Sequence, residues 1–397
     1  MILFVAAIGL GLWVSEARTN VSDYDDMRTV LEVIAVVKRN YVEHVSVLDL
    51  LRGYVKHGTI NGMLSVLGDP YTRYLPPHAF QQMRLDSQGE FEGIGIVVGL
   101  REGQLTIVGP IEGTPGFRAG LRGGDKILQV DDRSTKNMSL DEAVSLMRGP
   151  AGTEVKLIIE KGNTGEIVEV AINRANVKVK SVTKIEMLGD GVGYIRLASF
   201  TEKSAEELQT AMDELKARGM KGLVLDLRGN PGGLMDTAVK VADLFIDEGP
   251  LLHVVPRPDV DEPVTFYATS EGTERDLPLV VMVDQYSASA SEIVSGAFKD
   301  TGRALVLGVQ TFGKGLVQQV VPLRSGDAVT VTMARYQTAG KHDIHEVGVA
   351  PDVVVELPEG VDPPYFAIAE QSVEDVDKLV NLDEDPQLRA AKALLTD

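Results

Sequence analysis

The sequence predicts an α/β protein in which a small β-rich module interrupts an α/β core, with a helical segment in front of both. Strand and helix signals alternate between residues 177 and 357, the pattern of a sheet with helices packed against it. Between residues 90 and 176, short strand signals surround one helix. Before them, apolar residues recur at helical spacing from Met27 to Val37. A chain of 397 residues has the length of two or three domains, which agrees with these parts.

Composition excludes several classes of function. The net charge of −19 argues against a nucleic-acid partner, because phosphate binding needs clustered Lys and Arg. The chain has no cysteine, which excludes disulfides, thiol catalysis and thiolate metal sites. Gly313-Lys314 lacks the spaced upstream glycine and the following Ser or Thr of a phosphate-binding loop, so no nucleotide motif is present.

The first nineteen residues are typical of an export signal. Residues 2–14 form an uncharged apolar run, and Glu16 is the first charged residue. The run is shorter than the roughly 20 residues of a membrane span, and it is similar to the apolar part of a secretory signal or signal anchor. A buried N-terminal helix is the alternative. We expect residues 1–19 to be a signal-like or anchor segment that places the chain in the bacterial periplasm or on the extracytoplasmic face of the inner membrane, with membrane association through the N-terminus.

Residues 20–89 are predicted to be a helical region. The helical spacing is followed by further short helices through Met63 and Leu67, and then by a turn at 69–72. No plausible catalytic cluster occurs in this region. The apolar positions that carry the first helix are Met27, Val30, Leu31, Ile34 and Val37.

The β-rich module is predicted to span residues 90–176. Its single helix covers 140–147 and begins at a capping box formed by Ser139 and Glu142. Alternating and β-branched residues indicate the strands. These are predicted at 95–100, 105–108, 126–130, 155–160 and 167–172.

The core, 177–357, carries the candidate chemistry where a strand at 280–283 leads into a helix at 292–299. Ser289 stands at that junction, and a further strand at 304–307 delivers Lys314 back to the same edge of the sheet. A serine at a helix N-terminus and a lysine between two glycines, with no histidine near them, indicate a Ser-Lys nucleophile pair.

A purely structural interpretation of the serine is a capping box, because Glu292 follows Ser289 by three positions. Two further features favour chemistry. Gln318 lies four residues after Lys314, within reach of its amine. Upstream, the strand at 223–228 ends in a glycine-rich turn at 229–233 whose bare N–H groups can form part of an oxyanion hole.

At these positions the chain resembles the carboxyl-terminal processing peptidases, or tail-specific proteases. The matching segments are DLRGNPGG (226–233), SASASEI (287–293) and TFGKG (311–315), and the resemblance runs from about Tyr24 to about Leu357. It implies a crotonase-like core with Ser289 as nucleophile, Lys314 as base and Gln318 as the residue that orients the lysine. Asp300 and Thr311 fall on family positions that support the site. Tyr286 departs from the glycine that usually precedes the SASAS run.

The chemistry follows from the residue types. Lysine can act as the base only when it is neutral near pH 7, which burial away from carboxylates favours, and an amide such as Gln318 can orient it without adding negative charge. The tetrahedral oxyanion would be met by the N–H of Ala290 and one from Gly232 or Gly233. The resemblance implies a serine endopeptidase that cleaves proteins at or near their C-termini and uses no cofactor.

The β-rich module resembles a PDZ domain. The pattern runs from Gly93-Ile94-Gly95-Ile96 through 114–121 to Gly124-Asp125-Lys126-Ile127. Such a domain adds a peptide as an extra strand and binds its terminal carboxylate with loop amides, here those around Ile94, Gly95 and Ile96. The expected partners are therefore proteins or peptides with accessible C-termini. The family resemblance also leads us to expect a homo-oligomer and an adaptor protein.

Other features do not change this interpretation. His342 and His345 with their acidic neighbours lie in a predicted loop and strand and not on a zincin helix, so no metal site is expected. The chain turns acidic over 358–397, with a last helix at 386–395. Two competing functions remain, a catalytically silent PDZ scaffold and an acyl-CoA-handling crotonase relative. The intact Ser-Lys-Gln set argues against the first, and the PDZ insertion argues against the second.

Overall fold

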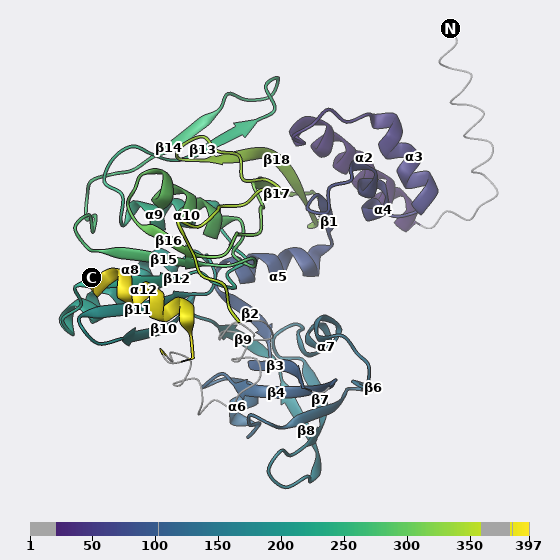
Figure 1. The fold of residues 1–397 in the computed structure, drawn as a ribbon. Helices are drawn as coiled ribbons and strands as arrows, with labels where there is room; N and C mark the ends of the chain where they lie inside the picture. The colour runs from purple at the N-terminus through teal and green to yellow at the C-terminus, as the bar shows by residue number, and fades with distance from the viewer. Residues whose placement is uncertain (1–20, 102, 359–381, 383, 397) are drawn as a thin grey trace. The chain divides into compact units, whose positions relative to one another are not determined.

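The computed structural model of the chain describes residues 21–101, 103–358, 382 and 384–396 (Figure 1). The predicted signal-like segment 1–19 lies outside these residues, as does most of the acidic stretch after 358. The chain forms two compact units. The first contains residues up to 80 together with 255–262 and 316–335, and the second contains 81–254, 263–315 and the residues from 336 onward. Within the described ranges, no helix is both long and apolar enough to cross a membrane.

The first unit is built from helices and a hairpin. Ser46 and Thr59 cap two of its helices, since their hydroxyls accept the N–H groups of Asp49 at 3.4 Å and Gly62 at 3.0 Å. The elements are α2 (Val21–Asn40), α3 (Val47–His57), α4 (Ile60–Leu64), η1 (Ser65–Leu67), β1 (Arg73–Leu75), β17 (Leu316–Pro322) and the part of β18 (Ala328–Thr338) up to residue 335.

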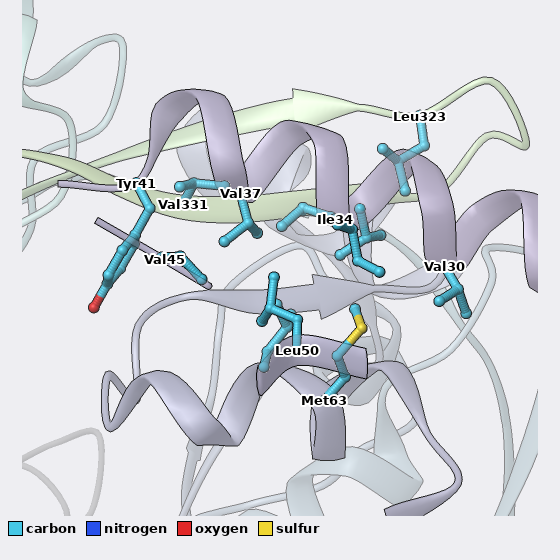
Figure 2. Packing of buried hydrophobic residues seen from close by; sticks show 12 residues of the cluster. Val30, Ile34, Val37, Tyr41, Val45, Leu50, Met63, Leu323 and Val331 are labelled. Atoms are coloured by element: carbon cyan, nitrogen blue, oxygen red, sulfur yellow. The ribbon is translucent and has the colours of Figure 1, made fainter. Parts of the chain in front are cut away.

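The helical region does not form its core alone. Figure 2 shows α2 packed against α3 and α4 and against the hairpin, which contributes Leu323 and Val331. The predicted first helix is confirmed, but its buried face is narrower than expected. Val30, Ile34 and Val37 are buried, whereas Leu31 is 56% exposed because it lies about 100° around the helix from Val30.

The second unit holds a six-stranded sheet in the order β10-β11-β12-β15-β16-β19. The first pair is antiparallel and the others are parallel. Strands β12 and β15 are buried along their whole length, as expected for parallel strands covered on both faces. The strands are β10 (Val182–Met187), β11 (Val192–Leu197), β12 (Gly222–Asp226), β15 (Leu279–Val283), β16 (Leu305–Gly308) and β19 (Val353–Val354).

Helices cover both faces of this sheet. Leu388 and Ala391 of α12 (Pro386–Thr396, yellow in Figure 1) pack on alternate strand residues such as Val224 and Met282. Because side chains alternate along a strand, the intervening residues face the other side. The helices that contact the sheet or one another there are α8 (Ser204–Ala217), α9 (Met235–Asp243) and α10 (Ala290–Asp300).

The β-rich module is a genuine insertion within the second unit. The chain enters it through β2 (Glu90–Gly93) and leaves through β9 (Ala175–Lys178), and these two strands pair antiparallel with Glu90 opposite Lys178. Its sheet has the order β3-β4-β5-β7-β8, with β6 beside β5. The other elements are β3 (Ile96–Arg101), β4 (Gln104–Pro110), α6 (Pro115–Arg118), β5 (Lys126–Val130), β6 (Arg133–Ser134), α7 (Leu140–Met147), β7 (Glu154–Glu160) and β8 (Ile167–Asn173).

Most element boundaries agree with the sequence prediction. The predicted helix at 140–147 and the strand at 126–130 coincide with α7 and β5. Ser139 caps α7 as expected, because its hydroxyl accepts the N–H of Glu142 at 3.2 Å. The remaining elements are α5 (Pro77–Ser87), β13 (Pro250–Pro256) and β14 (Val264–Tyr267).

Candidate active site

Ser289 stands at the N-terminus of α10, at the end of the turn that follows β15. Its φ of 54° and ψ of −110° are unusual for a residue other than glycine. Such backbone strain is typical of functional sites, where the surrounding structure holds it in place. The side chain is half-buried, while the neighbours Ala288 and Ala290 are buried.

Ser289 and Glu292 form the predicted capping box at the start of α10. Oε2 of Glu292 accepts the N–H of Ser289 at 2.8 Å, which is one half of the predicted capping box. The N–H of Glu292, the third residue of α10, donates to the backbone carbonyl of Ser289 at 2.9 Å and faces the Ser289 side chain, which forms the other half of the box. The capping box predicted for Ser289 and Glu292 is therefore confirmed.

The same carboxylate holds the segment that carries the lysine. Oε1 of Glu292 accepts the hydroxyl of Thr311 at 2.6 Å and the N–H of Gly313 at 2.7 Å. Oε2 accepts the N–H of Lys314 at 2.9 Å. Glu292 is fully buried, so its charge is balanced by these donors. The sequence analysis assigned it only to the cap, because no local pattern reveals its contacts 19 to 22 residues ahead.

Tyr336 of β18 makes a second link between the two segments, and the sequence analysis did not find it. Its hydroxyl lies 2.9 Å from the backbone carbonyl oxygen of Ser289 and is hydrogen-bonded to that of Lys314. Burial raises the pKa of the phenol well above its ordinary value, and the Glu292 carboxylate raises it further. Tyr336 therefore keeps its proton and acts as a donor to these carbonyls.

The glycines beside Lys314 are required by close packing of the backbone. A Cβ atom on Gly313, whose φ is 91°, would lie 3.0 Å from the N of Val347. One on Gly315 would lie 2.6 Å from the N of His345. Only glycine therefore fits at both positions, as the sequence pattern indicated. Lys314 itself is half-buried.

Gln318 lies on β17 in the first unit, opposite Thr332 of β18. Its side-chain Nε2 is buried and has no hydrogen-bond partner within the described residues. A buried amide with unused donors is uncommon and is typical of a functional position. Ser289 and Lys314 belong to the second unit, and it is their two segments that Glu292 and Tyr336 tie together.

The glycine-rich turn lies directly against Ser289. A Cβ atom on Gly232 would lie 2.8 Å from Cβ of Ser289 and 2.9 Å from the N of Ala290. The N–H of Gly232 donates to Oδ1 of Asn230 at 2.9 Å. For Gly233 and Ala290, the described residues provide no hydrogen-bond acceptor to the N–H groups. These two N–H groups are thus available to an oxyanion.

Hydrogen bonds of Asn230, Ser287 and Ser291 hold the glycine-rich turn against the segment that carries Ser289. The carbonyl oxygen of Asn230 accepts the N–H of Ala288 at 3.0 Å and the hydroxyl of Ser291 at 2.9 Å. The hydroxyl of Ser287 donates to the carbonyl of Leu227 at 2.8 Å. Ser287 and Ser291 are fully buried, so both have structural roles and differ from Ser289.

The two residues expected to support the site have different positions. Thr311 bonds Glu292 through its hydroxyl, which also accepts the N–H of Val349 at 2.6 Å. Asp300 lies at the other end of α10, eleven residues after Ser289 or about 16 Å along the helix axis. There it accepts the N–H of Gly340 at 2.7 Å and contacts Nδ1 of His342 at 3.1 Å. Thr311 thus joins the reaction centre, whereas Asp300 holds a loop.

Tyr286 lies on an ordered turn next to the site. Oδ1 of Asp284 accepts the N–H of Tyr286 at 3.0 Å and that of Gly229 at 2.9 Å. The Tyr286 side chain is 46% exposed. The departure from the family glycine therefore adds an exposed aromatic ring three residues before the nucleophile without disturbing the turn.

The predicted carboxylate-binding loop lies between β2 and β3 of the module. Gly95 has a φ of 74°, and a Cβ atom there would lie 2.3 Å from Cβ of Thr114, so glycine is required. The hydroxyl of Thr114 holds the loop by donating to the carbonyl of Gly95 at 2.8 Å. Ile94 is buried in the module core, Ile96 is half-buried, and β3 lies at the edge of its sheet.

No metal centre was found in the described ranges, which contain no group of three or more His, Cys, Asp or Glu side chains able to hold an ion. His342, one of the two histidines considered above, contacts Asp300 and Thr338.

Three parts of the chain match models of known protein families. The model described as Peptidase family S41 matches residues 191–355, and that of a PDZ domain matches 106–161. A model described as the activating protease CtpB N-terminal domain matches 13–78. The first match contains Ser289 and Lys314, and the second lies within the β-rich module.

Individual relatives are similar in sequence to this chain over most of its length. A carboxyl-terminal-processing protease of Synechocystis sp. is 35% identical over 373 residues, covering 89% of this chain and 87% of the relative. The carboxy-terminal processing protease CtpA of Bacillus subtilis is 35% identical over 364 residues, covering 92% and 76%. The solved structure of a photosystem II D1 C-terminal processing protease matches with a TM-score of 0.55 at 33% identity, covering 86% and 95%. The chain therefore belongs to the carboxyl-terminal processing proteases, serine-type peptidases of family S41 with a PDZ domain.

Proposed function

We propose that this chain is an endopeptidase that uses Ser289, Lys314 and Gln318 to cleave proteins at or near their C-termini. One observation carries the proposal. Glu292 and Tyr336 each bond the backbones of both Ser289 and Lys314, so the segment that carries the base is held beside the segment that carries the nucleophile. A purely structural serine would not require this double link.

The reaction follows the general course of acyl transfer. Oγ of Ser289 attacks the scissile carbonyl carbon while the neutral amine of Lys314 takes the hydroxyl proton. The tetrahedral intermediate collapses to an ester on Ser289, and Lys314 returns the proton to the leaving amine. Water then attacks the ester with Lys314 again as base, which releases the acid and restores the hydroxyl. Gln318 orients the lysine amine through its amide and adds no charge that would hold it protonated.

The oxyanion is met by the N–H groups of Ala290 and Gly233. Of the two glycines considered, Gly232 already donates its N–H to Asn230, which leaves Gly233 as the donor. Ala290 is the first residue of α10, where N–H groups lack helical partners and the helix dipole favours negative charge. Gly232 serves instead to let the turn approach Ser289.

Substrate tails are bound by the PDZ domain. Strand β3 lies at the edge of the module sheet beside α7, so a peptide can add to it as a further strand. Ile94 and Gly95 form the loop before β3 and Ile96 begins that strand, and the amides of these three residues would meet the terminal carboxylate. The catalytic domain would then act on a polypeptide whose tail is already held.

The chain is further proposed to act outside the cytoplasm. The support is the uncharged apolar run at 2–14, which is typical of export signals. Expression of the whole chain and of a form without residues 1–19 in a bacterial host, followed by fractionation, tests this. The whole chain should be found in the periplasm or with the inner membrane, and recovery of both forms from the cytoplasm would contradict the proposal.

The catalytic assignment is tested with an unfolded protein substrate. Ser289→Ala should abolish cleavage, and Lys314→Arg should do the same because guanidinium cannot give up its proton. Ser291→Ala is the matched control, since it removes a buried hydrogen bond worth about 1 kcal/mol and should lower thermal stability while most turnover remains. Full activity of Ser289→Ala would refute the assignment, and absence of cleavage by the wild type would favour a silent scaffold.

A further inference from the structure

The C-terminal helix is anchored by a buried carboxylate at its first turn. Oδ1 of Asp385 accepts the N–H of Leu388 at 3.0 Å and so caps α12. The same side chain accepts the guanidinium of Arg228, with Oδ2 to Nη2 at 2.8 Å and Oδ1 to Nη1 at 3.2 Å. Oε1 of Gln387 accepts Nη1 as well, at 2.9 Å. The end of the chain is thus joined to a residue 157 positions earlier.

Arg228 is held from its other side by the sheet. Its Nη2 donates to Oδ2 of Asp226 at 2.8 Å and its Nε to Oδ1 at 3.0 Å. The hydroxyl of Tyr194 donates to the same Asp226 carboxylate at 2.7 Å. Asp226, Arg228 and Asp385 are at most 2% exposed, so the guanidinium lies between two carboxylates away from water. A bidentate geometry of this kind fixes an arginine in one position.

Arg228 directly precedes the turn that presents the oxyanion donor. Asp226 is the last residue of β12, and the next residues, 229–233, form the turn whose Gly232 lies against Ser289. The N–H of Gly229 is held by Asp284 at 2.9 Å. The direction in which the chain leaves β12 therefore depends on where the Arg228 side chain is anchored.

We propose that Asp385 is a positioning residue that acts through Arg228 to hold the turn 229–233 in register with Ser289. The last helix of the chain then completes the reaction centre as well as covering the sheet. Without Asp385, the guanidinium keeps Asp226 and Gln387 but loses one of the two carboxylates that balanced its burial, so Arg228 and the turn after it move. The proposal rests on the proposed function, since it concerns the oxyanion donors of the same site.

This role predicts a particular kinetic effect. Donors to the oxyanion act on the transition state more than on bound substrate, so a displaced turn lowers kcat and leaves KM nearly unchanged. A shift of about 1 Å in such a group can cost on the order of 10²-fold in rate. A helix that only stabilised the fold would change the melting temperature and leave kcat unaffected at temperatures well below it.

The test compares Asp385→Ala and Asp385→Asn with Leu388→Ala, all in the full chain. The apolar side chain of Leu388 packs α12 on the sheet and cannot hydrogen-bond Arg228, so its variant is the control for loss of helix docking. At 25 °C and well below each melting temperature, Asp385→Ala should lower kcat at least about tenfold with KM within about twofold. Asp385→Asn keeps an acceptor oxygen and the cap and should recover part of kcat. Leu388→Ala should lower the melting temperature and keep the wild-type kcat.

Two results would overturn the proposal. The first is a kcat of Asp385→Ala equal to that of the wild type. If Asp385→Ala does not fold, a wild-type kcat in Asp385→Asn is the result that counts. The other is a loss of kcat in Leu388→Ala as large as that in Asp385→Ala, which would assign the effect to docking of the helix in general. Ser289→Ala, assayed in parallel, separates the two proposals. An active Ser289→Ala refutes the proposed function, whereas an inactive Ser289→Ala beside a normal Asp385→Ala refutes only the positioning role.

Discussion

The carboxylate of Glu292 accepts the backbone N–H of Lys314 at 2.9 Å on the same oxygen that accepts the N–H of Ser289 at 2.8 Å. One atom therefore sets the distance between the two segments that carry Ser289 and Lys314. The side chain is fully buried, and its other oxygen is occupied by Thr311 and Gly313. A helix-capping residue thus also fixes the spacing of Ser289 and Lys314.

Replacement of this carboxylate by an amide should disorder the lysine segment. In Glu292→Gln, one oxygen becomes an NH₂ group facing N–H or O–H donors, which should cost about 1–3 kcal/mol of stability. We expect kcat to fall about 10-fold or more because Ser289 and Lys314 lose their common anchor. Glu207→Gln is the matched control, since Oε2 of Glu207 also accepts two backbone N–H groups, those of Ser181 and Val182. Equal kcat in both variants would contradict the role of Glu292.

The close approach of the glycine-rich turn predicts a strong effect at Gly232. In Gly232→Ala the new Cβ would lie 2.8 Å from Cβ of Ser289, and the φ of 102° is unfavourable for alanine. We expect kcat to fall about 100-fold or more. Gly249→Ala controls for backbone strain alone, because Gly249 has a φ of 92° with open space around it. This variant should lose about 1–2 kcal/mol of stability and keep its activity. Retained kcat in Gly232→Ala would show that the turn tolerates displacement.

Asp226 contributes to the free energy of unfolding, and this contribution is lost at acid pH. Burial alone would raise the pKa of Asp226, but the cations of Arg228 and Arg196 outweigh this, and the pKa lies below its ordinary value. Because the folded-state pKa is lower than the unfolded one, the stabilisation is present above the unfolded pKa of about 3.9. It is lost as the pH falls through the folded-state pKa. Urea unfolding of the wild type and Asp226→Asn should therefore differ by a constant free energy above about pH 5 and by less below about pH 4. A difference independent of pH would contradict this.

Recognition of the substrate's C-terminal carboxylate can be tested first by changing the substrate and not the protein. Polypeptides that end in a free carboxylate should be cleaved faster than the same chains with an amidated end, because the loop before β3 would bind the carboxylate. Ile96→Asp should remove this preference by placing a negative charge at the start of the edge strand. Ile94→Asp is less suitable, since Ile94 is 2% exposed and a charge there would disrupt the module core. An amidated substrate cleaved as fast as the free one would exclude recognition of the carboxylate.

Local patterns were sufficient to predict much of the fold. The period of apolar residues, the capping residues and the glycine positions gave the boundaries of α7 and β5. They also placed Ser289 at a strand-to-helix junction and Lys314 where only glycine neighbours fit. These features depend on residues a few positions apart, so the sequence carries them directly.

The sequence by itself therefore determined the α/β class, the inserted module and the candidate nucleophile and base, because those follow from spacing along the chain. The tertiary structure decided which buried polar groups hold them. Tyr336 contacts the carbonyl of Ser289 from 47 residues away, and Asp385 contacts Arg228 from 157 residues away. Such contacts depend on which strand edges and helix ends meet in space. A buried charge or phenol must find its partners wherever packing brings them, and no local period records that choice.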